Sequence, residues 1–249
     1  MSLLTFLGRR WPRGAQPQPA RDVRPAFYAL GPGSWRDYVT LLHPPYTAWH
    51  LSYVAVGAGL APRLDGWRLG ATFAAFFLAL GIGAHALDEL NGRPLRTKIP
   101  AAVLVAVALV SVAGAAALGI VVAVSFSLWL LAFVAAGTFL VFAYNLELCG
   151  GSFHTDLWFG LAWGAFPVLT AYFAMAGRLR AEAAVAAAFA TLLSLAQRTL
   201  STPVREVRRR GALGDVEASA VIRPAESALR LLTGAAVALG AALLLSHLR

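Results

Sequence analysis

Residues 99–146 read IPAAVLVAVALVSVAGAAALGIVVAVSFSLWLLAFVAAGTFLVFAYNL, a run of 48 residues without Asp, Glu, Lys or Arg. One helix needs about 20 apolar residues to cross the hydrocarbon core of a bilayer. The run is therefore long enough for two spans, and we expect the turn between them near residues 121–127. Because its apolar residues are continuous rather than alternating, the run does not fit the strands of a membrane barrel.

Further charge-free runs lie on either side of it, at residues 38–62, 69–87, 157–177, 183–197 and 231–246. With the central pair they predict an all-α fold, a polytopic transmembrane helical bundle of about seven helices within residues 38–249. The composition agrees, because 59% of the residues are apolar and only 13% are charged, against about 25% in a soluble domain. A soluble protein is thereby excluded, and the single Cys149 excludes a disulfide scaffold.

The basic residues are distributed unevenly between the two sides of this predicted bundle. Residues 1–37, 88–98, 147–156 and 198–230 carry 16 of the 21 Lys and Arg residues, and the other side carries 5. The positive-inside rule places the richer side in the cytoplasm, which predicts an integral protein of the cell membrane with a cytoplasmic N-terminus. Residues 1–37, with six arginines and five prolines, are expected to form a flexible basic cytoplasmic tail. The net charge of +9 then reflects topology and contact with anionic membrane lipids, not binding to nucleic acid.

The second predicted span ends in a polar cluster, HALDELNGRPL at residues 85–95. On a helix His85, Asp88 and Glu89 share one face, and Asn91 follows one turn on. Oxygen ligands at this spacing suit Mg²⁺, which commonly binds one or two carboxylates and leaves its other positions to water and phosphate. The alternative is that Asp88 and Glu89 form a solvated helix end opposite the arginines that follow.

A second polar cluster, YNLELCGGSFHTD at residues 144–156, lies on the same side and contains no Lys or Arg. This composition favours a loop that folds toward a site. The alternative is that Thr155 and Asp156 only cap the fifth helix. His43 and His50, at the start of the first span, are expected to be hydrogen-bond partners between helices rather than ligands.

The third cluster closes the sixth span, with the sequence QRTLSTPVRE at residues 197–206. It places Arg198 and Arg205 at the end of a helix, where the guanidinium fork suits the oxygens of a diphosphate. The arginines at residues 208–210 are expected to mark topology and to meet anionic lipid.

The order of these clusters resembles that of the UbiA superfamily of intramembrane prenyltransferases over about residues 38–210. LHPPYT at residues 42–47 is similar to the family's entry into its first helix, and residues 88–95 resemble its first Asp-rich motif. Tyr144 with its Gly-containing loop, followed by residues 161–173, resembles the family's Tyr-containing loop and next helix. The polar end of the sixth span falls where the second Asp-rich motif is expected.

The resemblance implies a helical bundle with a cavity that opens toward the cytoplasm and toward lipid. It also implies transfer of an isoprenoid chain from a prenyl diphosphate to an aromatic or lipid acceptor, assisted by Mg²⁺. Carried onto this sequence, it assigns catalytic roles to Asp88, Tyr144 and Glu206, substrate binding to Arg93, Lys98, Asn145, Arg198 and Arg205, and metal binding to Asp88, Glu89 and Asn91.

The sequence departs from the family's motifs at several points. Leu87 stands where the first motif has Asn, Asn91 where it has its second Asp, and the second motif contains no aspartate. A second hypothesis is therefore a non-catalytic relative that binds an isoprenoid, quinone or lipid, or scaffolds a membrane complex. A retinal protein is excluded because the only lysine, Lys98, lies in a loop. A transporter is left open, although no pair of Gly/Pro-broken helices stands in matching halves.

Overall fold

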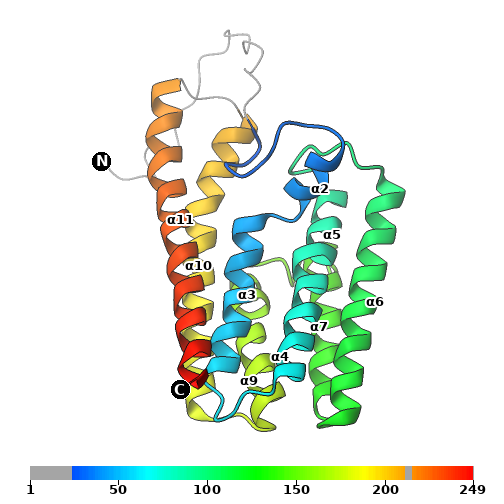
Figure 1. Cartoon of the computed structure of the whole chain (residues 1–249). Helices are drawn as coiled ribbons and strands as arrows, with labels where there is room; N and C mark the ends of the chain where they lie inside the picture. The colour runs from blue at the N-terminus through cyan, green and yellow to red at the C-terminus, as the bar shows by residue number, and fades with distance from the viewer. Residues whose placement is uncertain (1–23, 211–214, 249) are drawn as a thin grey trace.

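The structure is a computed structural model that describes residues 24–210 and 215–248, and within these residues all regular secondary structure is helical. The helices lie side by side as one bundle (Figure 1). In chain order they are α2 (Trp35–Leu41), α3 (Pro44–Gly59), α4 (Gly66–Phe76), the π-helix η1 (Phe77–Ala84), α5 (His85–Leu90), α6 (Ala101–Ser125), α7 (Leu130–Asn145), α8 (Asp156–Phe159), the π-helix η2 (Gly160–Ala165), α9 (Phe166–Ala176), α10 (Ala181–Arg210), α11 (Asp215–Leu245) and the 3₁₀-helix η3 (Ser246–Leu248).

Two groups of these elements are continuous, because α4, η1 and α5 form one rod and α8, η2 and α9 form another. The described residues thus contain seven rods that run along the bundle, beside the short α2. Five are long and apolar enough to cross a membrane: Gly66–Leu90, Ala101–Ser125, Asp156–Ala176, Ala181–Arg209 and Val216–Leu248. The prediction of an all-α membrane bundle is confirmed.

The helix boundaries differ from the charge-free runs where charged residues continue a helix. The sixth run was expected to end at residue 197, but α10 continues to residue 210, and α11 begins at residue 215 rather than near residue 231. Glu and Arg are good helix formers, so the charges mark the membrane boundary and not the end of the helix. The turn between α6 and α7 falls at residues 126–129, close to its predicted position.

The start of α3 is determined by two prolines. Pro44 and Pro45 occupy the first helical positions, where the missing N–H has no intrahelical partner to lose. A proline disfavours the helical conformation in the residue before it, and His43 is left-handed with φ 45° and ψ 56°. The first predicted span is therefore two helices, α2 and α3, separated at His43.

The helices approach closely where small residues face each other. A Cβ atom on Gly57 of α3 would lie 2.2 Å from the carbonyl oxygen of Val168 in α9, and one on Gly164 of η2 would lie 2.5 Å from that of Ala190 in α10. Such small residues let helix backbones pack against one another in lipid. They pack α3 against α9 and η2 against α10.

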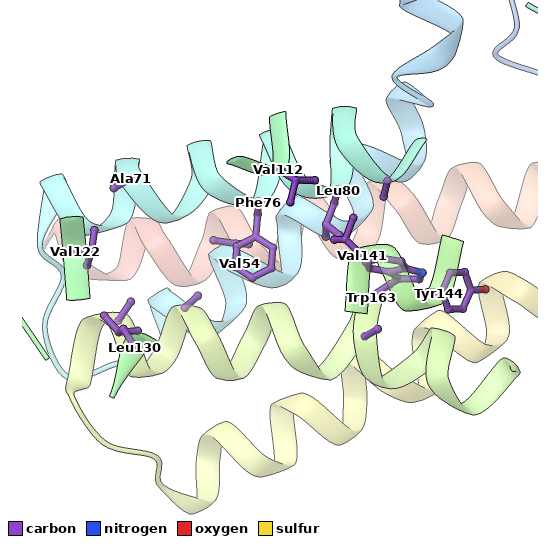
Figure 2. Packing of buried hydrophobic residues seen from close by; sticks show 14 of the residues in the cluster. Val54, Ala71, Phe76, Leu80, Val112, Val122, Leu130, Val141, Tyr144 and Trp163 are labelled. Carbon is purple, nitrogen blue, oxygen red and sulfur yellow. The ribbon is translucent and has the colours of Figure 1, made fainter. Parts of the chain in front are cut away.

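The largest buried cluster lies between the rods and includes Val54, Phe76 and Val141. Figure 2 shows Trp163 and Tyr144 at one end of this cluster, with the tyrosine hydroxyl directed away from the apolar side chains. Trp163 and Tyr144 are in edge-on contact, with ring centroids 5.3 Å apart. This pair therefore lies where the apolar core meets the polar side chains described below.

Both π-helices are joined to a histidine through a carbonyl oxygen. His85 Nδ1 lies 3.1 Å from Gly81 O of η1, and His50 Nδ1 lies 3.0 Å from Trp163 O of η2. Since a carbonyl can only accept, Nδ1 is the donor in each ring. The expectation that His50 is a hydrogen-bond partner between helices is confirmed.

The end of the bundle that carries α2, α5 and the C-terminal part of α10 is called the polar end below. Residues 1–23 of the predicted tail lie outside the described residues, so the prediction for them stays a prediction. From Arg24 onward the chain is irregular up to α2, and it is attached to that helix by hydrogen bonds such as Leu30 N–H to Thr40 Oγ1, 3.0 Å. This irregular segment, residues 24–34, contributes to the site.

Candidate functional site

A cavity of about 560 Å³ lies at the polar end, between the irregular segment, the start of α3, the loop after α5, and helices α10 and α11. Six of the residues proposed from the sequence line it: Asp88, Asn91, Arg93, Arg198, Arg205 and Glu206. They come from two parts of the chain separated by about 100 residues, and the bundle brings them together.

Glu89, proposed as a metal ligand, is instead the anchor of the loop that follows α5. Its carboxylate is fully buried and accepts hydrogen bonds from Leu95 N–H at 2.9 Å, Thr97 N–H at 2.8 Å and Thr97 Oγ1 at 2.9 Å. These three bonds engage both carboxylate oxygens. The adjacent Asp88, about 100° further round the helix, is the carboxylate that lines the cavity.

Asn91 connects the first polar cluster to the second. Its amide nitrogen donates to Glu147 Oε1 at 3.2 Å and to the carbonyl oxygen of Asn145 at 3.4 Å. Asn145 itself is buried, and its amide donates to Val141 O at 2.7 Å within α7. Asn145 therefore lies outside the cavity and holds Asn91 through its carbonyl oxygen, while Asn91 lines the cavity.

Arg198 is held by two partners. Its Nε donates to an Asp156 carboxylate oxygen and its Nη1 to the Tyr144 hydroxyl. The guanidinium also lies 5.4 Å from the Phe159 ring centroid. Thr155 caps α8, as the alternative prediction for this residue stated, because its Oγ1 accepts a hydrogen bond of 3.2 Å from Trp158 N–H. Asp156 was also predicted to cap this helix, but its carboxylate forms an ion pair with Arg198.

Arg205 and Arg208, three residues apart on α10, differ in their partners. Arg208 pairs with Glu226 of α11, Nη2 to Oε1 at 2.6 Å, and donates to Arg24 O at 2.8 Å. For Arg205 the described residues supply one long hydrogen bond, 3.5 Å to Thr202 Oγ1. Arg208 thus joins α10, α11 and the irregular segment, whereas Arg205 keeps most of its donors available in the cavity.

Arg93 and Lys98 are placed differently although both follow α5. Arg93 lines the cavity and donates to Ile99 O at 2.6 Å. Lys98 is exposed and away from the cavity wall, and its backbone N–H donates to Asp37 Oδ2 at 3.0 Å. The wall as a whole carries six arginines and three carboxylates, a formal charge of +3, which favours an anion.

Another part of the wall is aromatic. It includes His43 and Tyr46 of the LHPPYT stretch, whereas the sequence gave no signal for Phe27 or Tyr28. Phe27, Tyr28, His43 and Tyr46 line the cavity. Tyr28 lies 5.5 Å from Tyr46 and 5.3 Å from His43 between ring centroids, and His43 stacks on His85 at 4.1 Å. The Tyr28 hydroxyl lies 2.7 Å from His43 Nδ1. Burial raises the pKa of Tyr28 well above its usual range, so this hydroxyl stays protonated.

The described residues contain no group of three or more His, Cys, Asp or Glu side chains that could hold a metal ion. On the cavity wall the first polar cluster supplies one carboxylate, Asp88, and one amide, Asn91. This donor set suits an ion that brings phosphate ligands with it, and it is too small to enclose an ion by itself.

No protein-family model, no curated protein and no solved structure matches the chain. The fold and the cavity define an α-helical membrane protein with a basic and partly aromatic cavity at one end of its bundle.

Proposed function

We propose that the protein is a UbiA-like membrane prenyltransferase that binds the diphosphate of an isoprenoid diphosphate in the basic cavity and transfers the chain to an aromatic or lipid acceptor. The observation that carries the proposal is the convergence of Asp88, Arg198, Arg205 and Glu206 on one cavity. Their common position supports a site that binds one charged group from two sides.

The arginines supply the chemistry that departure of a diphosphate requires. Arg198 is oriented by Tyr144 and Asp156 before any ligand binds, so little freedom is lost when it contacts phosphate oxygens. Arg205 retains donors for a two-point contact with phosphate. Fixed positive groups placed where negative charge develops stabilise the transition state.

Mg²⁺ is the proposed cofactor, held by Asp88 and Asn91 together with the oxygens of the diphosphate. One or two carboxylates with substrate phosphates are a usual ligand set for this ion. When bound, it supplies positive charge beside the leaving diphosphate. Glu89 is omitted from this proposal because its oxygens are engaged by Leu95 and Thr97.

A second, apolar cavity supports an amphipathic ligand. It has a volume of about 100 Å³ and lies between α4, η1, α6, α7, η2 and α9, with Trp163 of η2 on its wall. Trp163 contacts Tyr144, whose hydroxyl binds Arg198 of the basic cavity. The Tyr144–Trp163 pair thus separates a place for a hydrocarbon chain from a place for its charged head group.

The proposed orientation places the polar end in the cytoplasm and the chain in the cell membrane. It follows from the excess of Lys and Arg in the connections at that end. The diphosphate would then enter from the cytoplasm.

The second candidate is binding without transfer, and the small number of carboxylates on the wall favours it. Glu226 is paired with Arg208. Glu89, next to Asp88, accepts hydrogen bonds from the loop that follows α5 and is not available in the cavity. A protein of this kind would hold an isoprenoid phosphate, a quinone or a lipid head group through the arginines alone.

Turnover by the full chain in nanodiscs tests the proposal. Prenyl diphosphates of several chain lengths are supplied with Mg²⁺ and a panel of aromatic and lipid acceptors, and released diphosphate is measured. Wild type should release diphosphate and Asp88→Asn should not, whereas Glu217→Gln, an exposed change on α11 away from the cavity, should match wild type. Binding that persists with EDTA and yields no product would instead identify the non-catalytic candidate.

A further inference from the structure

The short helix α2 has a reversed distribution of polar and apolar side chains. It buries Asp37 and Thr40, which are 5% and 3% exposed, whereas Trp35 and Tyr38 are 63% and 46% exposed. A helix whose outer face meets water carries polar residues on that face and apolar residues toward the core. The outer face of α2 is therefore suited to a partner other than water.

Hydrogen bonds on the buried face of α2 hold the helix in this orientation. The Asp37 carboxylate accepts from Gly33 N–H and from Lys98 N–H, both at 3.0 Å, so both of its oxygens are engaged. Turning the aromatic rings inward would break these bonds and leave buried polar groups without partners, which is costly. The outward position of the two rings is thus fixed by the fold.

The bond to Lys98 also places α2 at the boundary of the membrane. Lys98 shortly precedes Ala101, the first residue of α6, which is long and apolar enough to cross a bilayer. Figure 1 shows α2 at the same end of the bundle as the start of α6. Trp and Tyr are enriched at this depth, because their apolar rings and polar groups suit the level of the lipid head groups.

Two basic side chains accompany the rings. Arg36 is exposed on α2, with its guanidinium carbon 5.9 Å from the Trp35 ring centroid, and Lys98 is exposed next to the same helix. Within residues 24–210 and 215–248 no ion pair joins Arg36 or Lys98 to a carboxylate. The adjacent Asp37 is buried, so the surface carries two cations, which attract anionic lipid head groups.

We propose that Trp35, Arg36, Tyr38 and Lys98, called the α2 surface below, bind an anionic phospholipid of the surrounding leaflet. The two cations contact the phosphate and the rest of the head group, and the two rings contact the glycerol and the first part of the acyl chains. None of the four residues lines the basic cavity, so the inference goes beyond the proposed function and does not depend on it. The surface is also separate from residues 208–210 of α10, the arginines that the sequence assigned to lipid contact.

Quenching of tryptophan emission by brominated lipids tests the proposal on the full chain in nanodiscs. Two preparations contain the same mixture of phosphatidylcholine and phosphatidylglycerol, and an equal mole fraction of one lipid or the other carries bromine near the top of its acyl chains. The contribution of Trp35 is the difference between wild type and Trp35→Phe. It should report about fivefold enrichment of phosphatidylglycerol, the effect of one basic residue near the lipid surface. The enrichment should fall in about 1 M salt, which screens the charges.

Removing the two charges should remove the enrichment. In the double variant Arg36→Gln with Lys98→Gln, the two brominated lipids should quench Trp35 equally. Arg36→Lys with Lys98→Arg keeps both charges and should keep the enrichment. The matched control is Arg178→Gln with Arg180→Gln, which removes two exposed arginines between α9 and α10, at the other end of the bundle, and should leave the enrichment unchanged.

Trp67 is the reference ring within wild type, because it is 60% exposed in the first turn of α4 at the opposite end of the bundle. Its contribution is obtained with Trp67→Phe, and the two lipids should quench it equally. The same enrichment at Trp67 as at Trp35 would overturn the proposal, since only the net charge of the protein would then attract the lipid.

The proposal would also be overturned by a Trp35 that neither lipid quenches, by one that both lipids quench equally, or by enrichment that persists without the charges of Arg36 and Lys98. The first two outcomes need only the exchange of an exposed ring for a similar one, so they are decisive even where the charge variants do not fold. No prenyl diphosphate is present in these measurements. A failure of the proposed function can therefore be distinguished from a failure of this inference.

Discussion

Two arginines at opposite ends of the bundle differ in how fully their guanidinium groups are engaged. Arg68, in the first turn of α4, donates from Nη1 to the carbonyl oxygens of Ala174 at 3.0 Å and Met175 at 3.5 Å. Its Nε lies 3.6 Å from Asp65 Oδ2, and its guanidinium carbon lies 3.8 Å from the centroid of the Phe126 ring. Carbonyls at a helix end have no intrahelical partner, so Arg68 closes the end of α9.

Arg205 at the polar end presents the opposite case. It lies on the wall of a cavity of about 560 Å³, and the described residues give it a single long hydrogen bond. Both arginines stand near the end of an apolar helix, and in the sequence they look alike. The difference in their partners distinguishes an arginine that stabilises the fold from one that is available to an anionic ligand.

Replacing Arg68 should have the largest effect. It should lower the stability of the fold and leave ligand binding unchanged. Arg68→Met removes two hydrogen bonds to carbonyls and a cation–π contact, and we expect a loss of about 3 kcal/mol in the free energy of unfolding. Unfolding in mixed micelles with increasing SDS measures the loss. Binding of inorganic pyrophosphate should stay the same, and a variant as stable as wild type would contradict the assignment.

Replacing Arg205 should have the reverse effect. Arg205→Gln removes charge-assisted hydrogen bonds worth about 2 kcal/mol, which corresponds to roughly 30-fold weaker binding of geranyl diphosphate. Isothermal titration calorimetry measures the affinity, and the melting temperature should not change. Arg223→Gln, exposed on α11 and away from the cavity, carries the same loss of charge and serves as the control. Equal weakening in both variants would mean that only net charge matters.

Replacing Asp156 tests an intermediate case. Its partner Arg198 lies on the cavity wall, but two of the guanidinium nitrogens of Arg198 already have hydrogen-bond partners. Asp156→Asn weakens the contact to Arg198 Nε but leaves the bond to Tyr144. We expect geranyl diphosphate to bind about fivefold more weakly, since an ion pair with an exposed partner is worth up to about 1 kcal/mol. Ser152→Ala in the same loop is the control. Tighter binding in Asp156→Asn would show that the carboxylate competes with the ligand for Arg198.

The fold could be predicted from the sequence because the relevant signal is local. A charge-free run of the length of residues 99–146 has few other ways to satisfy its backbone in lipid. The ends of the helices were harder to predict, since α10 continues through its arginines to residue 210. Arg93, Arg198 and Arg205 of the site could also be foreseen, because polar clusters at helix ends are visible in the chain. Arg208 and Arg209, which were expected to mark topology and meet lipid, also line the cavity, because α10 continues past residue 197.

The rest of the site depends on rotation and on distant packing. Asp88 and Glu89 are neighbours, and which of them faces the cavity is determined by the rotation of α5, in a rod that contains the π-helix η1. No pattern in the sequence places Tyr28 beside His43, because the irregular segment reaches that position through contacts with α10 and α2. The pair of Arg198 with Asp156 likewise joins residues 42 positions apart.

The smallest effect is expected at Asp65, the carboxylate that lies beside Arg68. The Asp65 carboxylate caps α4 by accepting from Arg68 N–H at 2.8 Å, and this hydrogen bond lowers the pKa of the carboxyl below its usual value. A lowered folded-state pKa contributes stability above the unfolded-state pKa, and that contribution is lost as the pH falls through the folded-state value. Asp65→Asn keeps a capping side chain without the charge, so its melting temperature should lie slightly below that of wild type at pH 7 and meet it in acid. Parallel curves of melting temperature against pH would show that Arg68 is held by the carbonyls of α9 and the Phe126 ring without help from the charge of Asp65.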